Sequence, residues 1–214
     1  MNRKYEINTK ENREFLKNSC ENLLSFGHRF PSPNGGSYYL GDDGTPWKDR
    51  NRETWITCRM AHVYSLGLML GHEGSGELVD AALKGLKGEL HDDVNGGWYA
   101  GVTPDGGIVP NKQCYAHAFV ILAASSALTA ERPGAKELLD EALDVYDRYF
   151  WNEEEGLACD TWNTEFTVLD DYRGLNANMH TVEAFLATGD VIGDKKYHIR
   201  AGRIIDHVIQ WAEA

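Results

Sequence analysis

The sequence predicts an all-α fold in which helices form an inner and an outer layer, as in an α/α barrel or a solenoid of helical hairpins. Three segments each combine a glycine- and aromatic-rich turn, a short polar stretch and a helix that is apolar on nearly every side. Helices with a single apolar stripe alternate with them, and no long strand run interrupts the pattern. A helix that is apolar all round must be enclosed, whereas a striped helix can face water, so the alternation implies two layers.

The three repeated segments keep the same order of parts, which is typical of a repeat architecture. They read NGGSYYLGDDGTPWKDRNRETWITCRMAHVYSLGLML, NGGWYAGVTPDGGIVPNKQCYAHAFVILAASSALTA and EEGLACDTWNTEFTVLDDYRGLNANMHTVEAFLATG. Each contains a histidine, and His62, His117 and His180 lie 55 and 63 residues apart. In the first two segments Gly and Asp punctuate short aromatic runs such as Trp98-Tyr99, which predicts short β-hairpins in the loops before the enclosed helices.

Four striped helices are predicted around these segments. In the last of them Tyr197, Ala201, Ile204 and Val208 recur at helical spacing, with charged residues on the opposite side. The four ranges are 11–27, 75–91, 134–150 and 194–212. Together with the enclosed helices, of which 115–130 is the clearest, they give about seven helices, and nothing supports a parallel α/β sheet.

Length, charge and cysteine content narrow the class of protein. The 214 residues contain no Pro/Ser-rich linker, so we expect a single domain over residues 1–214. The 21 Lys and Arg against 33 Asp and Glu give a net charge of -12, which would repel nucleic acid or an acidic membrane surface. Four scattered cysteines without C-x-x-C spacing fit a reduced cytoplasm. Residues 1–10 lack the pattern of a signal peptide, and the longest apolar run, Ala116 to Ala124, is too short to cross a bilayer.

Polar residues near the starts of the enclosed helices predict the functional site. In a layered array the connections that lead into the inner helices gather at one end, so residues there converge on a common depression. The residues expected in this depression are Arg59, Tyr115, His117, Asn176 and His180. Helix N-termini offer unpaired N–H groups and partial positive charge, which suit hydroxyl-rich or anionic ligands. Aromatic loop residues, of which Trp55 shares the turn before Arg59, would supply stacking surfaces for a sugar.

No metal site and no cofactor are expected. HDDVNGGWYAGV places Asp93, Asn95 and Gly96 at calcium-loop spacing, but the position that needs a bidentate Glu is Val102. No His/Cys cluster has metal-ligand spacing, and neither G-x-S-x-G nor a phosphate loop occurs. The site is therefore expected to work with amino-acid side chains alone.

Five stretches of the chain carry a family resemblance. They are WITCRMAHVYSLG, GGWYAGV, KQCYAHAFVILAASSA, YFWNEEEG and YRGLNANMHTVEAFLA. Together they resemble the N-acylglucosamine 2-epimerase superfamily, most closely its branch of aldose–ketose isomerases acting on mannose or sulfoquinovose. The similarity runs from about Phe15 onward, and the R-G-x-N-A-N-M-H run is its most specific part. The resemblance implies an (α/α)6 barrel and a metal-free isomerase or epimerase acting on a monosaccharide.

The resemblance also implies roles for the residues of the depression. In aldose–ketose members of the family a histidine base removes the proton at C2, which gives a cis-enediol, and the proton returns to C1. An imidazole suits this chemistry because its pKa lies near neutrality. His180 matches a histidine that helps to open the sugar ring and hold the substrate, and Arg59 matches the arginine that polarises the carbonyl or enediolate oxygen. Tyr115 and Asn176 match residues that bind substrate hydroxyls, and His117 lies beside them as a further binding candidate.

The residues alone leave a structural alternative for these assignments. A histidine near a helix start often serves the backbone, which applies to His180, and a histidine one turn inside an apolar helix, such as His117, is commonly a hydrogen-bonded core residue. Arg59 would otherwise pair with a carboxylate such as Glu53 or Asp49.

The resemblance covers only part of a family member. The family barrel has twelve helices, whereas this chain ends at Ala214, in or just after its seventh. The histidines that match the proton-shuttling acid and base belong to later helices, and His198 and His207 lie in a striped outer helix and do not replace them. We therefore expect the chain alone to have half the pocket and little or no turnover. A missing C-terminal half or a homodimer partner would cover the open barrel, because burial of apolar surface contributes about 25 cal/mol per Å².

Three other functions stay open at this point. A 2-epimerase would return the proton to the other face of C2. A glycoside hydrolase would need two carboxylates roughly 5–10 Å apart, and Asp160, Asp170 and Asp171 lie near the expected depression although none starts an inner helix. A non-catalytic half-barrel that binds carbohydrate is the third alternative.

Overall fold

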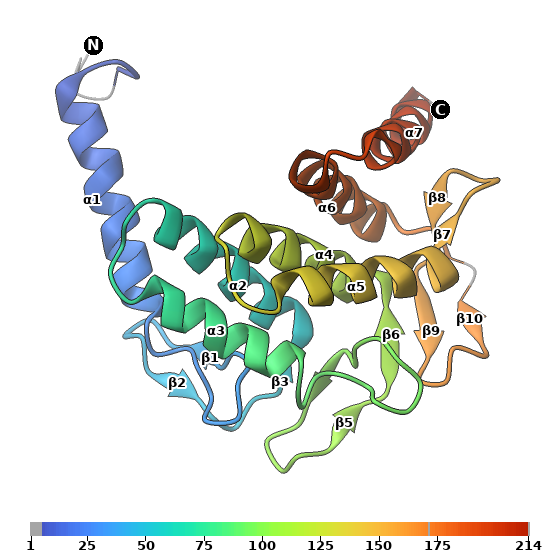
Figure 1. Cartoon of the computed structure of the whole chain (residues 1–214), viewed down its shortest axis with the longest axis horizontal. Coiled ribbons are helices and arrows are strands. Elements are labelled where there is room, and N and C mark those ends of the chain that lie inside the picture. The colour runs from blue at the N-terminus through green and yellow to red at the C-terminus, as the bar shows by residue number, and fades with distance from the viewer. Residues whose placement is uncertain (1–5, 171, 214) are drawn as a thin grey trace.

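Seven helices account for most of the part of the chain that the structure, a computed structural model, describes, namely residues 6–170 and 172–213 (Figure 1). They are α1 (Lys10–Gly27), α2 (Thr54–Met69), α3 (Ser75–Leu86), α4 (Cys114–Thr129), α5 (Ala135–Tyr149), α6 (Leu175–Ile192) and α7 (Lys195–Glu213). The predicted all-α class with about seven helices is confirmed.

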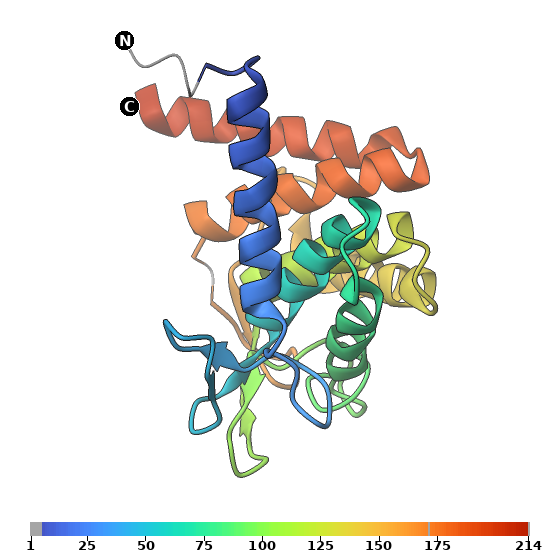
Figure 2. The same ribbon diagram turned by 90° about the vertical axis from the view of Figure 1, so that its left-hand side faces the viewer.

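The helices form two layers. α2, α4 and α6 lie side by side, and α3, α5 and α7 each pack against the inner helix that precedes them in the chain (Figure 1). α4, the middle inner helix, buries 13 of its 16 residues, whereas α5 and α7 bury one stripe each. Figure 2 shows α6 and α7 together at one edge of the array, and Figure 1 shows α1 on the opposite side, where it contacts α2. The predicted alternation of enclosed and striped helices is confirmed.

Local sequence sets most helix ends. The Thr9 side chain accepts a hydrogen bond from the Asn12 N–H at the start of α1, and the Asp194 side chain accepts one from the Lys196 N–H at the start of α7. Gly193, with φ 72°, ends α6 in the left-handed conformation that glycine adopts without strain. Three of the four striped helices begin and end within one residue of their predicted limits.

α3 is the exception, because it ends at Leu86 and not near residue 91. The Leu90 N–H donates to the Gly85 carbonyl, so residues 87–90 form turns that lead into the next loop. Gly85 also touches the loop before β1, since a Cβ placed there would lie 2.2 Å from the backbone nitrogen of Gly36. The two backbones meet directly, and only glycine permits this approach.

Short antiparallel strands fill the connections between the layers. The described residues contain ten strands of two or three residues: β1 (Tyr39–Leu40), β2 (Pro46–Trp47), β3 (Arg52–Glu53), β4 (Gly101–Val102), β5 (Ile108–Val109), β6 (Asn111–Gln113), β7 (Trp151–Asn152), β8 (Leu157–Ala158), β9 (Thr161–Asn163) and β10 (Leu169–Asp170). The predicted hairpins are present, and β3–β4 and β6–β9 pairs add links between successive loops. These links hold the loops together where α2 and α4 begin (Figure 1).

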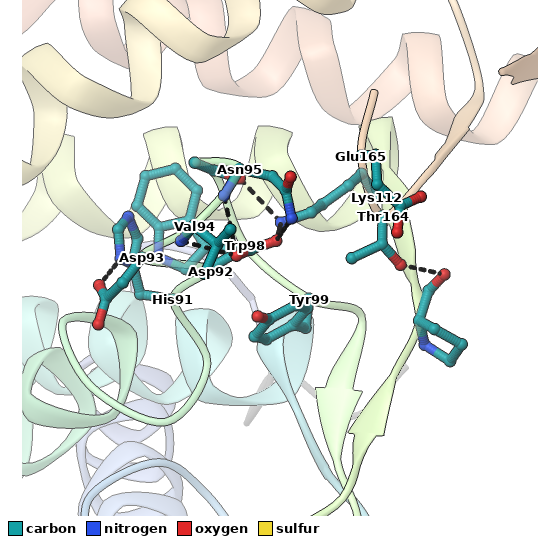
Figure 3. Close-up of polar contacts among 12 residues, drawn as sticks. His91, Asp92, Asp93, Val94, Asn95, Trp98, Tyr99, Lys112, Thr164 and Glu165 are labelled. Carbon is teal, nitrogen blue, oxygen red and sulfur yellow. Dashed lines mark hydrogen bonds and ion pairs between the residues drawn. The ribbon is translucent and has the colours of Figure 1, made fainter. Parts of the chain in front are cut away.

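A buried ion pair organises the loop between α3 and β4 (Figure 3). The Lys112 Nζ lies 2.8 Å from the Asp92 Oδ2, and both side chains have no exposed surface. Asp92 also accepts from the N–H groups of Val94 and Asn95, and Lys112 donates to the Gly96 carbonyl. Burial alone would raise the pKa of Asp92, but the hydrogen bonds from Lys112 and Asn95 outweigh it and lower the pKa below its ordinary value. The stretch with calcium-like spacing is therefore held by the chain's own ammonium group.

Candidate functional site

The three inner helices carry side chains at equivalent positions. They begin at Thr54, Cys114 and Leu175, so successive starts lie 60 and 61 residues apart. Positions two and six of a helix lie on one face, so the array presents six side chains together. The second positions are Trp55, Tyr115 and Asn176, and the sixth positions are Arg59, Phe119 and His180.

Five of these six side chains meet in one cluster, which we call the cup: Trp55, Arg59, Tyr115, Phe119 and His180. The Arg59 guanidinium donates to the Tyr115 hydroxyl at 3.3 Å, and its central carbon lies 5.1 Å from the Trp55 ring and 4.7 Å from the Phe119 ring. The His180 ring centroid lies 5.1 Å from that of Tyr115 and 4.6 Å from that of Phe119. Residues from α2, α4 and α6 thus line one surface, and the sequence placed four of the five there.

The Arg59 guanidinium is not paired with any described carboxylate. In residues 6–170 and 172–213 its guanidinium forms no ion pair, and its contacts are the Tyr115 hydroxyl and two aromatic faces. Glu53, the alternative partner, accepts instead from the Tyr39 hydroxyl at 2.6 Å. A guanidinium over an aromatic face gains about 0.5–1 kcal/mol at exposed sites, so the rings hold Arg59 while its donors stay available to an oxygen of a ligand.

Asn176 lies in a pocket beside the cup. The pocket has a volume of about 660 Å³, and Tyr115, Asp160, Tyr172 and Asn176 contribute to its lining. Because Tyr115 belongs to both, one aromatic ring connects the pocket with the cup. Of the three carboxylates considered for a glycoside hydrolase, Asp160 contributes to the lining of this pocket.

The other two carboxylates of that alternative lie outside this lining or outside the described residues. Asp170 is in β10, where it pairs with Thr161 of β9, and Asp171 lies outside the described residues. Of the three acidic residues, the described structure therefore places one in the lining of the pocket.

His117 does not line the cup, where we expected it as a substrate-binding candidate. Its side chain is buried, its Nδ1–H donates to the Gln113 carbonyl at 2.8 Å, and its Nε2 accepts from the Trp98 N–H at 3.1 Å. Burial lowers the pKa of His117 to about 3, so the ring is neutral at physiological pH. The physical reason is its place in α4, since the fourth position faces the preceding loop and not the cup.

The fourth position has the same task in all three inner helices. Thr57 in α2 donates to the carbonyl of its N-cap residue and accepts from the Ser37 N–H at 3.0 Å. Asn178 in α6 donates to the carbonyl of its N-cap residue and accepts from the Ala158 N–H at 2.8 Å. Like His117, each side chain ties the preceding loop to the first turn of an inner helix. Equivalent residues are therefore Thr57, His117 and Asn178, and not the three histidines.

The polar residues at the start of α6 divide into two kinds. Arg173 donates two hydrogen bonds to the Glu155 carboxylate, at 2.8 and 3.2 Å, and Asn178 serves the backbone. Asn176 and His180 face the pocket and the cup. Two of the four polar residues at the start of α6, Arg173 and Asn178, therefore make structural contacts.

Sequence reasoning missed Phe119 as a member of the cup. Phe119 follows Tyr115 by four residues, and that spacing on a helix is the signal that would have found it. A carboxylate also contacts a ring of the cup, because Glu183 lies three residues after His180 and its Oε2 is 2.9 Å from the His180 Nδ1.

Within the described residues no group of three or more His, Cys, Asp or Glu side chains is arranged to hold a metal ion. None of the described helices is long and apolar enough to span a bilayer.

Comparison with known proteins identifies the family. Residues 35–214 match the N-acylglucosamine 2-epimerase (GlcNAc 2-epimerase) family. The chain belongs to this family. It is 40% identical over 193 residues to a D-mannose isomerase of Thermobifida fusca, covering 90% of this chain and 47% of the relative. It is 38% identical over 196 residues to a D-mannose isomerase of Pseudomonas cannabina pv. alisalensis, covering 92% of this chain and 47% of the relative.

Solved structures of the N-acylglucosamine 2-epimerase family agree with the fold. A crystal structure of D-mannose isomerase superposes with a TM-score of 0.82 at 26% identity, over 90% of this chain and 51% of that one. The cellobiose 2-epimerase from Spirochaeta thermophila gives a TM-score of 0.78 at 19% identity, over 92% and 55%, and shares the fold. The chain spans about half the length of the curated relatives it matches. The predicted family and the partial (α/α)6-type barrel are confirmed.

Proposed function

We propose that this chain is one half of a sugar isomerase that interconverts an aldose and a ketose of the mannose–fructose type through a cis-enediol. The observation that carries the proposal is the meeting of Arg59, Tyr115 and His180 on one face, with a guanidinium that no described carboxylate neutralises. The names of the two relatives, both D-mannose isomerases, support the substrate class.

Each residue of the cup has a role in this proposal. Arg59 donates to the carbonyl oxygen and stabilises the negative charge that develops there as the enediolate forms. Tyr115 and Asn176 bind sugar hydroxyls, and Trp55 packs against the sugar ring. His180 exchanges hydrogen bonds, and when needed a proton, with a hydroxyl of the substrate. By family resemblance, the acid and base that move the proton between C2 and C1 come from helices that follow these seven.

The exposed apolar surface at the edge of the helical array supports the proposal that a partner covers it. An apolar groove of about 370 Å³ runs between α6 and α7, lined by residues that include Leu175, Met179, Ile205 and Ile209. These four side chains are 52%, 50%, 43% and 51% exposed, although each is strongly apolar. We propose that the C-terminal half of the barrel covers this face, with a second copy of the chain as the alternative. The four unpaired cysteines support the cytoplasm as the compartment.

Complementation tests the function directly. The chain is mixed with the C-terminal half of the Thermobifida fusca relative and incubated with mannose in deuterated water. Fructose labelled at C1 is the expected product, and the chain alone should give little or none. Glucose labelled at C2 as the main product would favour a 2-epimerase. If mannose neither binds by calorimetry nor reacts in the mixture, the non-catalytic alternative replaces the proposal.

A further inference from the structure

The contact between His180 and Glu183 determines which ring nitrogen carries the proton. The His180 Nδ1 lies 2.9 Å from the Glu183 Oε2. An ionised carboxylate accepts hydrogen bonds and donates none, so Nδ1 must be the donor. A neutral imidazole has one N–H, so in the neutral ring of His180 the Nε2 bears the lone pair.

The packing of the ring keeps this arrangement in place. The His180 side chain is 14% exposed and lies against the rings of Phe119 and Tyr115. A half-turn of the imidazole about its bond to Cβ would put a ring carbon against the Glu183 carboxylate and lose the hydrogen bond. The ring is thus held both by its neighbours and by one directional contact.

The second nitrogen of His180 is open. Its Nε2 makes no hydrogen bond to any described residue. Two buried side-chain atoms of the described residues lack a hydrogen bond, the Arg52 Nε and the Asn111 Oδ1, and the His180 Nε2 is not one of them. The Nε2 therefore reaches the surface in the cup. It is placed there as an acceptor.

We propose that Glu183 is a positioning residue that holds His180 as the Nδ1–H tautomer, so that the open Nε2 accepts a hydrogen bond from a sugar hydroxyl. The identity of the donor rests on the proposed function, whereas the tautomer does not. When Nε2 takes up a proton, the carboxylate beside Nδ1 compensates the new positive charge.

The charge of Glu183 also acts on a second imidazole, that of His62 in α2. Burial lowers the pKa of His62, and the negative charge of Glu183 partly opposes that effect. The hydrogen-bond partner of His62 is a different residue, because its Nδ1 lies 2.7 Å from the Ser126 hydroxyl.

Nitrogen NMR of the chain labelled with ¹⁵N-histidine tests the proposal. Long-range proton–nitrogen correlations at roughly pH 8.5, two units above the ordinary histidine pKa, identify the tautomer of each ring. The spectrum contains its own standard, because the Gln113 carbonyl fixes His117 as Nδ1–H. His180→Asn assigns the His180 signals by their loss.

Glu183→Gln is the informative variant, since an amide both donates and accepts and so removes the preference for one tautomer. The matched control is Glu137→Gln, an exposed residue in the first turn of α5. We expect an Nδ1–H His180 in the wild type and in the control, and a shift of its population toward Nε2–H in Glu183→Gln while His117 stays unchanged. An Nε2–H His180 in the wild type, or an unaltered tautomer in Glu183→Gln with His117 intact, overturns the proposal.

Adding mannose to the labelled chain mixed with the C-terminal half of the relative separates the two claims. A change at the His180 Nε2 supports both the tautomer and the sugar. An Nδ1–H His180 that mannose leaves untouched, in the mixture with the C-terminal half, supports the positioning role and counts against the proposed function.

Discussion

His117 and His180 lie in the first two turns of neighbouring inner helices, and each donates a hydrogen bond through Nδ1. Their second nitrogens differ. The Nε2 of His117 accepts from the Trp98 N–H inside the protein, whereas the Nε2 of His180 is open in the cup. One histidine joins a loop to a helix, and the other leaves a nitrogen without a described partner. Residue type and nearness to a helix start therefore do not separate the two environments, whereas the face of the helix on which the residue lies does.

The comparison extends to the two sets of equivalent positions. The loop-facing set of Thr57, His117 and Asn178 is almost completely buried, with exposed fractions of 0%, 1% and 0%, and each member is hydrogen-bonded to backbone. The set at position six contains Arg59, whose guanidinium forms no ion pair with a described residue, and His180, whose Nε2 makes no hydrogen bond to one. Substitutions in the loop scaffold should lower stability, whereas substitutions in the cup should lower ligand binding with little cost in stability.

The largest loss of stability is expected from Lys112→Met. This change leaves the buried Asp92 carboxylate without its ammonium partner, and breaking a buried pair from one side costs about 3–5 kcal/mol. Urea unfolding of the variant measures the loss. Lys136→Met, which removes an exposed pair with Asp140 in α5, is the matched control and should change stability by less than about 0.5 kcal/mol. Equal midpoints for the two variants would contradict the scaffold role of the Asp92–Lys112 pair.

The next largest effect is a dependence on pH that His117 imposes. Its folded pKa of about 3 lies below the ordinary value of 6.5, so between these values the unfolded chain binds a proton that the folded chain does not. Stability should therefore fall as the pH drops below 6.5, by up to about 1.4 kcal/mol per pH unit.

His117→Asn isolates this contribution. Asn178 makes the equivalent hydrogen bonds in α6, so asparagine is expected to keep the loop attached in α4 while removing the titrating ring. Unfolding at pH 7, 6 and 5 should show the wild type losing stability relative to the variant. A constant difference across this range would mean that His117 is not held neutral.

The sequence predicted the layers because enclosure leaves a clear pattern. α4 is apolar on every side and α7 has a single stripe, and each was assigned to the correct layer on that basis. The expectation that the starts of the inner helices gather at one end likewise placed Arg59, Tyr115 and His180 in one depression, and the three side chains lie together. These features depend on residue type over many positions, so an error of one residue in a boundary does not change them.

Which face a single residue occupies could not be predicted in the same way. Successive residues of a helix differ by about 100° in direction, so an error of two residues in the start of α4 moves His117 from the loop to the cup. The histidine spacings of 55 and 63 suggested an equivalence that the helix starts, 60 and 61 residues apart, exclude. The Asp92–Lys112 pair was also beyond local reasoning, because it joins a loop residue to a residue of β6 that lies 20 positions later in the chain.

Apart from the exposed control Lys136→Met, Arg59→Ala should have the smallest effect on stability of the changes considered, and it tests the cup side of the comparison. The variant loses the cation–π contacts with Trp55 and Phe119, so the free energy of unfolding should fall by no more than about 1 kcal/mol. Mannose binding in the complemented mixture should weaken tenfold or more, because a hydrogen bond to a charged group contributes about 1.5–3 kcal/mol. Arg59→Lys is the control that keeps the charge and loses the planar donor. A loss of stability as large as that of Lys112→Met, with binding unchanged, would mean that Arg59 belongs to the scaffold and that the division between the two faces is wrong.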